Sequence, residues 1–463
     1  MGTPFSSIDL ALLKKYDKPG PRYTSYPTAP IFSPSFTPQA YRESLVATNQ
    51  SGSSNDLSLY FHFPFCDTLC YFCGCTMLVT RDRDRIEEYN QYLKREMDLL
   101  APLVSKGRRV VQLHWGGGTP THLSPKQIHD IASHISSRFD FADDAERSVE
   151  LDPREMTQEH VAALAEAGFT RMSMGVQDFD ERVQESVNRI QPESMTRQVL
   201  DWARELGFTS VNIDLIYGLP HQTVDSFHQT IDTVLTFAPD RIAVFNYAHV
   251  PWLKSHQKLI LPEHLPTPEQ KLDILKMTIE SLSMAGYEYI GMDHFAKPTD
   301  ELARAQREKT LYRNFQGYST RSGADLYGIG MSSIGHFGRV YAQNLKTLPE
   351  YYKALREGDF ATHVGYTMTD DDVLRKYVIM RLMCDLELEF DAVEKEFGIH
   401  FAHYFSQALQ QLKPFEEDGL VTVSDRAIHI IGAGRLLLRN IAMPFDSYLE
   451  TMSKSKPIFS RTV

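Results

Sequence analysis

Six short segments rich in β-branched and aromatic residues alternate with amphipathic segments through the first half of this 463-residue chain, and this alternation constrains the fold most. We predict strands at LSLYFHF, VVQLHW, SVELD, RMSMGV, SVNIDLI and RIAVFNY. Between them apolar residues recur at helical spacing, as at Ile86, Tyr89, Leu93 and Met97. Repeated β-α units imply a parallel sheet. Six such units predict a partial (β/α)6 TIM-like barrel, with reactive residues at the carboxyl ends of its strands.

Three regions of different character follow one another along the chain. Residues 1–55 are rich in turn formers, and we expect an extension that lies over the main domain. Residues 56–365 hold the strand and helix repeats and form the predicted catalytic domain. Residues 366–463 have a helical pattern, with a helix near 390–413 and a two-stranded wing at GLVTVSDRAIHII. We therefore expect a small, mostly α-helical C-terminal domain.

The composition excludes several classes of protein. The chain has 48 Lys and Arg against 60 Asp and Glu, a net charge of −12, which argues against a nucleic-acid scaffold. Only five cysteines occur, which suits a reducing compartment, so we expect a cytoplasmic protein. The first twenty residues lack the apolar core of a signal peptide, and no run of 18 apolar residues occurs. We therefore expect neither export nor membrane spanning.

Three cysteines, Cys66, Cys70 and Cys73, follow the first predicted strand with the spacing C-x3-C-x2-C. A [4Fe-4S] cluster held by three thiolates leaves one iron free of protein ligands, so that iron can activate a small molecule. The alternative is structural zinc, but zinc usually takes four closed ligands, and no second cysteine pair occurs. Cys75 follows Cys73 too closely for easy ligation of the same metal. The spacing therefore predicts an iron–sulfur cluster on three cysteines, without a role for Cys75.

A glycine-rich segment, HWGGGTPTHL, continues the second predicted strand. Gly116, Gly117 and Gly118 let the backbone approach a ligand that a Cβ atom would block. A tight turn is the alternative explanation. Because this segment and the cysteine loop both follow parallel strands, we expect them to share one edge of the barrel as a cofactor site.

These two loops resemble the radical S-adenosylmethionine superfamily, whose signatures read CDTLCYFC and GGGTP in this sequence. Further segments are similar to the oxygen-independent coproporphyrinogen III oxidase family over nearly the whole chain. They include RYTSYP, HFPFC, ELDPRE, SMGVQDF, NIDLIYGLP, FNYAH, IGMDHFA, RNFQGY and YAQN.

The resemblance implies an enzyme of haem synthesis that converts two propionates of coproporphyrinogen III into vinyl groups, giving protoporphyrinogen IX. The reduced cluster would cleave S-adenosylmethionine to methionine and a 5′-deoxyadenosyl radical. That radical would take a hydrogen atom from the propionate β-carbon, after which carbon dioxide leaves and one electron passes to an acceptor. The resemblance also implies a flavodoxin- or ferredoxin-like electron donor and a monomeric protein.

The same resemblance implies residues that hold two molecules of S-adenosylmethionine. The first molecule would lie at Tyr60, Gly117, Glu150 and Ile334. The second would involve Phe72, Gly118, Thr119, Gln177, Arg189, Asp214 and Ala248.

For several of these residues the sequence leaves a plainer alternative open. Glu150 could be a solvated residue at a strand end, and Phe72 a core aromatic rather than a ring stacked on adenine. Arg189 falls in a segment with a helical pattern, where an arginine usually lies on a solvated face.

Five further residues are weaker candidates. We expect His62, Phe315 and Gln316 near the active site, although packing would explain them as well. A substrate with four propionates needs cationic partners, and planar guanidinium groups suit carboxylates best. Arg22 and Arg313 are therefore candidate propionate partners, with surface arginines as the alternative.

Two rival functions remain. The first is a haem-binding relative without decarboxylase activity; such relatives usually carry an aromatic residue at the position of Cys75 and lack RYTSYP. The second is a structural metal-binding or interaction protein. It is disfavoured because the cysteine loop, the glycine loop and acidic strand ends converge on one barrel edge.

Overall fold

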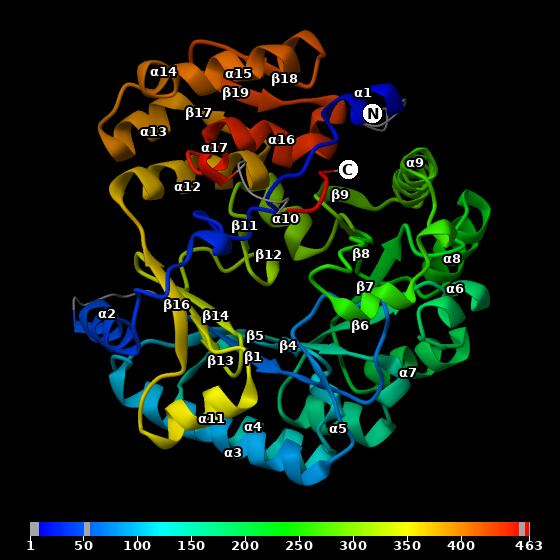
Figure 1. Ribbon diagram of the computed structural model, residues 1–463, viewed down its shortest axis with the longest axis vertical. Helices are drawn as coiled ribbons and strands as arrows, with labels where there is room; N and C mark the ends of the chain where they lie inside the picture. The colour runs from blue at the N-terminus through cyan, green and yellow to red at the C-terminus, as the bar shows by residue number, and fades with distance from the viewer. Residues whose placement is uncertain (1–8, 51–55, 453–458, 463) are drawn as a thin grey trace.

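The computed structural model describes residues 9–50, 56–452 and 459–462 (Figure 1). Its main element is a curved sheet of twelve strands in the order β16-β15-β14-β13-β1-β4-β5-β6-β7-β8-β10-β9. The strands are β1 (Leu57–Phe63), β4 (Val110–Gly117), β5 (Phe141–Leu151), β6 (Arg171–Gln177), β7 (Ser210–Tyr217), β8 (Arg241–Asn246), β9 (Glu288–Gly291), β10 (His294–Ala296), β13 (Asp325–Ile329), β14 (Ile334–Phe337), β15 (Val340–Asn344) and β16 (Thr362–Thr367).

The six predicted strands form the parallel core of this sheet, β1 and β4 to β8, so the partial (β/α)6 barrel is confirmed. The sheet is wider than predicted. β13 pairs in parallel with β1, β14 to β16 continue antiparallel, and β10 and β9 extend the other edge. The glycines of this extension pack against the protein itself, since a Cβ on Gly328 would meet the backbone carbon of Ile334 at 2.8 Å.

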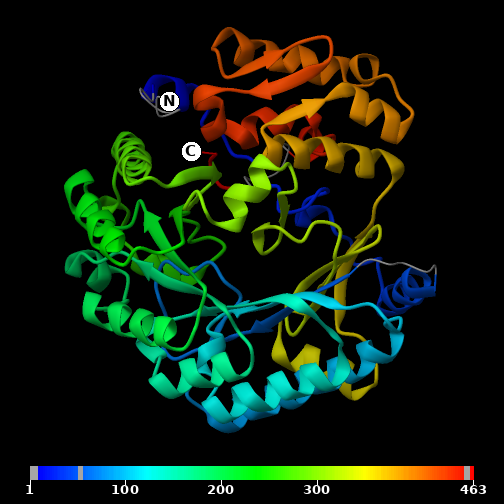
Figure 2. The same cartoon turned by 180° about the vertical axis from the view of Figure 1, so that it is seen from behind.

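Helices cover the outer side of the barrel strands in both views (Figures 1 and 2). Capping boxes fix where three of them begin, as at Ser124 with Gln127. These outer helices are α3 (Arg83–Leu100), α4 (Pro125–Arg138), α5 (Gln158–Glu166), α6 (Glu181–Ser186), α7 (Glu193–Glu205), α8 (Val224–Thr236), α9 (Pro268–Met284) and α11 (Leu348–Arg356).

Alternate residues of each barrel strand face two different environments. Leu59 and Phe61 of β1 are fully buried in the core shared with Leu93 of α3. On the other side of β1, Ser58 and Tyr60 contact polar or aromatic residues of β4. The barrel interior is therefore polar, as a cofactor or substrate site requires.

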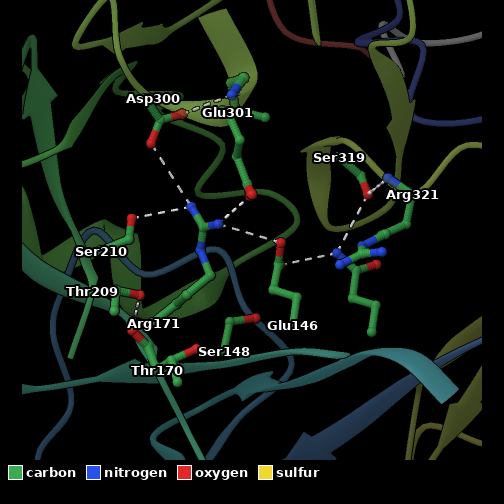
Figure 3. A network of polar contacts seen from close by, with 12 residues as sticks. Glu146, Ser148, Thr170, Arg171, Thr209, Ser210, Asp300, Glu301, Ser319 and Arg321 are labelled. Atoms are coloured by element: carbon green, nitrogen blue, oxygen red, sulfur yellow. Dashed lines mark hydrogen bonds and ion pairs between the residues drawn. The ribbon is translucent and has the colours of Figure 1, made fainter. Parts of the chain in front are cut away.

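A network of charged side chains occupies the amino-terminal ends of the barrel strands (Figure 3). Arg171 of β6 contacts Glu146 of β5 at 3.4 Å and also pairs with Glu301. Arg241 of β8 donates to Asp300 and Glu301, both at 3.0 Å. In this layer each buried guanidinium faces carboxylates, so charges are matched within the protein.

The C-terminal region consists of more and shorter helices and strands than predicted. The predicted helix at 390–413 is wrong: the chain forms α13, α14 and α15, because Gly398 takes a left-handed conformation (φ +65°) that ends α13. The wing has a third strand, since β17 pairs with β19. The elements are α12 (Asp370–Asp385), β17 (Glu387–Glu389), α13 (Phe390–Phe397), α14 (Phe401–Tyr404), α15 (Ser406–Glu417), β18 (Val421–Val423), β19 (Ala427–Ile430), α16 (Leu438–Ala442) and α17 (Leu449–Met452).

The N-terminal segment runs between the C-terminal helices and the barrel (Figures 1 and 2). Tyr16 at the end of α1 donates to the carbonyl of Pro414 at 3.0 Å.

Residues 1–8, which hold part of the signal-peptide prediction, and 51–55 lie outside the described residues. The predicted domain boundaries after residues 55 and 365 stay a prediction. The remaining elements are α1 (Leu10–Tyr16), α2 (Pro38–Gln50), β2 (Phe65–Cys66), β3 (Leu78–Val79), α10 (Glu301–Arg307), β11 (Tyr312–Asn314) and β12 (Gly317–Ser319).

Within the ranges just given, no helix combines the length and the apolar character that crossing a membrane would demand.

Candidate active site

The cysteine loop leaves β1 at the carboxyl end of the barrel. Cys70 is buried, Cys66 and Cys73 are partly exposed, and Cys75 is exposed. Among the described side chains, no three potential ligands gather closely enough for a single metal ion, which is the arrangement that structural zinc needs.

Backbone groups of the loop are held by two other segments. After α6, Asn188 donates to the carbonyl of Leu69 at 2.8 Å. After β8, Gln257 donates to the carbonyl of Phe72 at 2.9 Å, and His256 lies 2.7 Å from the carbonyl of Cys73. The loop conformation is therefore fixed by neighbours without use of the thiols.

Two arginines contact the sulfur of Cys70. Arg154 lies 3.3 Å from it and Arg189 lies 3.4 Å from it. Both also pair with the buried carboxylate of Asp152, at 2.7 and 2.9 Å. The solvated helical position considered for Arg189 is wrong, because the residue follows the end of α6 and is only 7% exposed.

The donor set fits an iron–sulfur cluster. Burial raises the pKa of the Cys66 thiol to about 12, and coordination to a metal ion would favour the thiolate instead. The hydroxyl of Thr119 lies 3.3 Å from that sulfur. Together with the guanidinium groups at Cys70, these groups stabilise negative charge on sulfur.

Glu150 lies near the end of β5 and contacts the glycine loop. Its carboxylate accepts from the backbone N–H of Gly117 at 3.1 Å, and the ring of His114 lies 3.2 Å away. Burial alone would raise the pKa of Glu150, but His114 and the Gly117 N–H outweigh burial and lower it. Since 46% of the Glu150 side chain stays accessible, the carboxylate is both ionised and open to a ligand.

Tyr60 and His62 of β1 form the neighbouring wall. The Tyr60 hydroxyl lies 3.1 Å from Nδ1 of His62, and the other ring nitrogen lies 2.8 Å from the carbonyl of Thr76. The Tyr60 ring stacks on His114 at 5.9 Å. Burial lowers the pKa of His62, so the imidazole is neutral at physiological pH. His62 thus lies among the candidate site residues, as predicted.

The glycine loop needs glycine mainly for contacts within the protein. A Cβ on Gly116 would meet the Glu150 carboxylate at 2.8 Å, and one on Gly117 (φ +116°) would meet the His62 ring at 2.7 Å. A Cβ on Gly118 would meet the backbone carbon of Pro64 at 2.7 Å. The predicted close approach is real, but the partners shown are protein atoms.

Gln177 ends β6, and Asp214 lies in the middle of β7, where it pairs with Gly175 of β6. Asp214 accepts from Ser173 at 2.8 Å and from Asn212 at 2.7 Å. Burial raises the pKa of Asp214 to about 6. Gln177 has a left-handed conformation (φ +71°), and its amide lies close to Gly175 beside the Arg189 guanidinium.

Three predicted residues have a more peripheral setting. Ala248 is exposed, two residues beyond the end of β8. Ile334 begins β14, partly buried beside Tyr341. Phe72 packs against the small apolar cluster that contains Val187 and Tyr247, so the core-aromatic alternative describes its present contacts.

Phe315 and Gln316 lie in the turn between β11 and β12. Phe315 makes edge contacts with the rings of Phe32 and Tyr341, at 6.4 and 6.1 Å. The side-chain nitrogen of Gln316 is buried, and no group among the described residues accepts its hydrogens. Packing accounts for Phe315, whereas Gln316 is available to a ligand.

Arg22 and Arg313 are neighbours, since Nε of Arg313 donates to the carbonyl of Arg22 at 3.2 Å. Arg22 pairs with Asp293 and Arg313 is only 2% exposed. The surface alternative is therefore wrong for Arg313, and Arg22 is partly covered.

Sequence reasoning missed His114, Asp152 and Arg154 as site residues. Each lies in a segment quoted for the resemblance, so the segments drew attention to the right positions. The contacts of Arg154 and Asp152 with the Cys70 environment depend on how distant loops fold together, for which the sequence carries no local signal.

Comparison with known proteins agrees with this geometry. A family model described as the radical SAM superfamily matches residues 60–234, and one described as the HemN C-terminal domain matches residues 368–437. The chain is thus a radical S-adenosylmethionine protein, a class whose cofactors are a [4Fe-4S] cluster and S-adenosylmethionine.

Comparison with curated relatives identifies the family within this class to which the chain belongs. Proteins named oxygen-independent coproporphyrinogen III oxidase from Salmonella typhimurium and Escherichia coli are each 49% identical over 455 residues, covering 98% of this chain and 98% of the relative. The solved Escherichia coli coproporphyrinogen III oxidase (HemN), titled a radical SAM enzyme, superposes with a TM-score of 0.91 at 48% identity, covering 96% of this chain and 99% of that one. The chain belongs to the oxygen-independent coproporphyrinogen III oxidase family.

Proposed function

We propose that the protein oxidatively decarboxylates two propionates of coproporphyrinogen III to vinyl groups without oxygen, giving protoporphyrinogen IX. One arrangement carries this proposal: Cys66 of the three-cysteine loop contacts Thr119 of the glycine loop, and Gly117 of the glycine loop donates to Glu150, whose charge also acts on Asp214. When bound, the cluster and S-adenosylmethionine supply the hydrogen-abstracting radical; each turnover releases carbon dioxide and passes one electron to an acceptor.

The residues of the chain bind and orient these groups. The thiolates of Cys66, Cys70 and Cys73 hold the cluster, and Arg154 and Arg189 stabilise its negative charge. We assign one S-adenosylmethionine to Tyr60, Gly117, Glu150 and Ile334. The ionised Glu150 carboxylate accepts hydrogen bonds from its ribose or ammonium donors. We assign a second molecule to Phe72, Gly118, Thr119, Gln177, Arg189, Asp214 and Ala248.

The test is anaerobic. The cluster is reconstituted, reductant, S-adenosylmethionine and coproporphyrinogen III are added, and 5′-deoxyadenosine and protoporphyrinogen are followed by chromatography. Formation of both products is the expected result. Deoxyadenosine without porphyrin product would favour the haem-binding relative or another substrate, and neither product from protein with an intact cluster would overturn the enzymatic proposal.

A reduced cluster requires an electron source, and we propose a flavodoxin- or ferredoxin-like donor. Trp252 and Leu253 are 63% and 65% exposed in the loop whose Gln257 holds the cysteine loop. Lys258 of the same loop is exposed as well. An apolar patch beside a lysine suits a small carrier with an acidic face.

We further propose that the protein works as a monomer in the cytoplasm. The small number of cysteines and the exposed Cys75 thiol suit a reducing compartment. Sedimentation at micromolar concentration tests the oligomeric state, and fractionation of cells tests the location.

A further inference from the structure

Three guanidinium groups lie close together between the barrel and the C-terminal helices. They belong to Arg22 of the N-terminal segment, Arg313 of β11 and Arg439 of α16. Arg313 donates to the carbonyl of Arg22 at 3.2 Å, and Arg439 donates to the carbonyl of Gly20 at 3.2 Å. Arg313 and Arg439 are 2% and 6% exposed. Burial, then the charges of Arg313 and Arg439, lowers the pKa of Arg22 to about 9, as expected for cations near one another.

The protein provides little negative charge for this cluster. Arg22 pairs with Asp293. Arg313 otherwise lies over the ring of Tyr318 at 4.8 Å, and Arg439 makes its second hydrogen bond to a backbone carbonyl, that of Arg461. Over the described ranges, Asp293 is the one carboxylate within ion-pair distance of the three guanidiniums; Asp17 acts on Arg439 from further away. Buried cations without counterions are costly.

Two buried polar atoms here also lack partners among the described groups: Nη1 of Arg313 and Nδ1 of His294. The His294 ring makes edge contacts with Tyr318 at 5.4 Å and with Phe245 at 6.0 Å. A native protein rarely leaves a buried donor without an acceptor unless a ligand or water takes that place. Nη1 of Arg313 is a donor, so its missing partner is an acceptor, and the surplus of positive charge favours an anion in that place.

The charged layer at the other end of the barrel shows what a purely structural arrangement looks like in this fold. Arg171 and Arg241 face Glu146, Asp300 and Glu301 there (Figure 3). Three carboxylates match two guanidiniums in that layer, whereas one carboxylate faces three guanidiniums near Arg313.

We propose that Arg22, Arg313 and Arg439 bind a propionate carboxylate of the tetracarboxylate substrate. This inference rests on the proposed function. The guanidinium of Arg22 lies 5.8 Å from the ring of Phe245 on β8, and β8 pairs with β7, which carries Asp214. The cluster thus adjoins the carboxyl end of the barrel, where the cofactors are assigned. A planar guanidinium donates hydrogen bonds to both oxygens of a carboxylate, which fixes the orientation of the carboxylate as well as matching its charge.

The test uses the reconstituted full-length protein and coproporphyrin III, the stable fluorescent oxidised form of the substrate. Arg313→Gln is expected to weaken its binding roughly tenfold or more, since hydrogen bonds to charged groups are the strong ones. The KM for coproporphyrinogen III should rise, while binding of S-adenosylmethionine stays unchanged. Arg313→Lys should recover only part of the loss, because it keeps the charge without the planar fork.

The matched control is Arg307→Gln, which removes an arginine paired with Glu288 on the exposed side of α10. It should leave coproporphyrin binding unchanged. If Arg313→Gln fails to fold, Arg22→Gln makes the same test, since Arg22 is 34% exposed and its loss is better tolerated.

Unchanged coproporphyrin affinity in Arg313→Gln or Arg22→Gln, in a wild-type enzyme that forms protoporphyrinogen, would overturn the inference and leave the proposed function standing. Loss of coproporphyrin binding in the same variants, in a wild type that forms no product, would support the carboxylate site and overturn the proposed function. The two failures are thereby distinguishable.

Discussion

The guanidinium of Arg189 lies 3.4 Å from the sulfur of Cys70, although the two residues are separated by 119 positions in the chain. Arg154, 84 positions from Cys70, reaches the same sulfur. Cys70 is a proposed cluster ligand, and two positive charges directed at it would favour the more negative, reduced state of the cluster. We therefore expect the loops after β5 and α6 to tune the reduction potential of the cofactor.

Removing one of these charges should make the cluster harder to reduce. A hydrogen bond to a charged group contributes ~1.5–3 kcal/mol. For a one-electron couple, a shift of 59 mV in reduction potential corresponds to a tenfold change in the equilibrium constant. Loss of this free energy in Arg154→Gln should therefore lower the reduction potential by about 60–130 mV. Asp152 keeps its pairing with Arg189 in this variant. Redox titration followed by electron paramagnetic resonance measures the change.

The control is Arg81→Gln, which removes an exposed arginine that pairs with Asp67 in the cysteine loop without reaching a sulfur. Equal potentials in Arg154→Gln and Arg81→Gln would contradict the tuning role.

Gly118→Ala should damage the glycine loop, because the added Cβ would meet the backbone of Pro64 at 2.7 Å. Forced overpacking costs about 1–3 kcal/mol, and the backbone of Pro64 cannot rotate away as a side chain could. We expect a lower melting temperature and a lower iron content after reconstitution. Gly74→Ala is the matched control in the cysteine loop, since nothing lies within 4 Å of its Cβ position. Similar iron content and stability in both variants would refute the steric argument.

The parallel core and the presence of an iron–sulfur cluster could be predicted because their signals are local, whereas the assignment of individual cysteines as its ligands stays a prediction. The period of the apolar residues defines β1 and β4 to β8, and the spacing of Cys66, Cys70 and Cys73 identifies a cluster with an open iron. Strands β14 to β16 gave no such signal, since they are only four to six residues long and their packing depends on partners elsewhere in the sheet.

The environment of Arg189 shows where local reasoning fails. Arg189 follows the short helix α6 by three residues, and the helical pattern of this segment predicts an exposed side chain. Its burial instead comes from Asp152 and Cys70, which approach from other loops. Contacts between loops that are distant in sequence decide which polar residue serves the site, and no sequence period reports them.

Asp214→Asn should change how stability depends on pH. Burial raises the folded-state pKa of Asp214 to about 6, above its ordinary value of 3.8, so the folded protein binds its proton more tightly than the unfolded chain does. Stability from this group is therefore present below pH 4 and is lost as pH rises to about 6. Asparagine removes the charge and keeps one carbonyl oxygen that can accept from Asn212, while its NH2 takes the place of the oxygen that accepts from Ser173.

The cofactor-free Asp214→Asn protein should consequently be more stable than wild type above pH 6, by at most about 3 kcal/mol. Below pH 4 the difference should vanish. Denaturant titrations of both proteins across this range measure it, and a difference that does not vary with pH would show that Asp214 titrates normally.

Charge reversal in the loop beside the cysteines should impair reduction by a protein donor without affecting a chemical one. Lys258 is exposed in the loop that also presents Trp252 and Leu253 and that holds the carbonyl of Phe72 through Gln257. Lys258→Glu should slow turnover with an acidic flavodoxin by roughly tenfold at low ionic strength, because steering of charged partners dominates encounter rates. Turnover driven by dithionite should be unchanged. Lys106→Glu, at another exposed lysine before β4, should affect neither assay. Equal slowing by both variants would mean that net charge, and not this loop, governs the encounter.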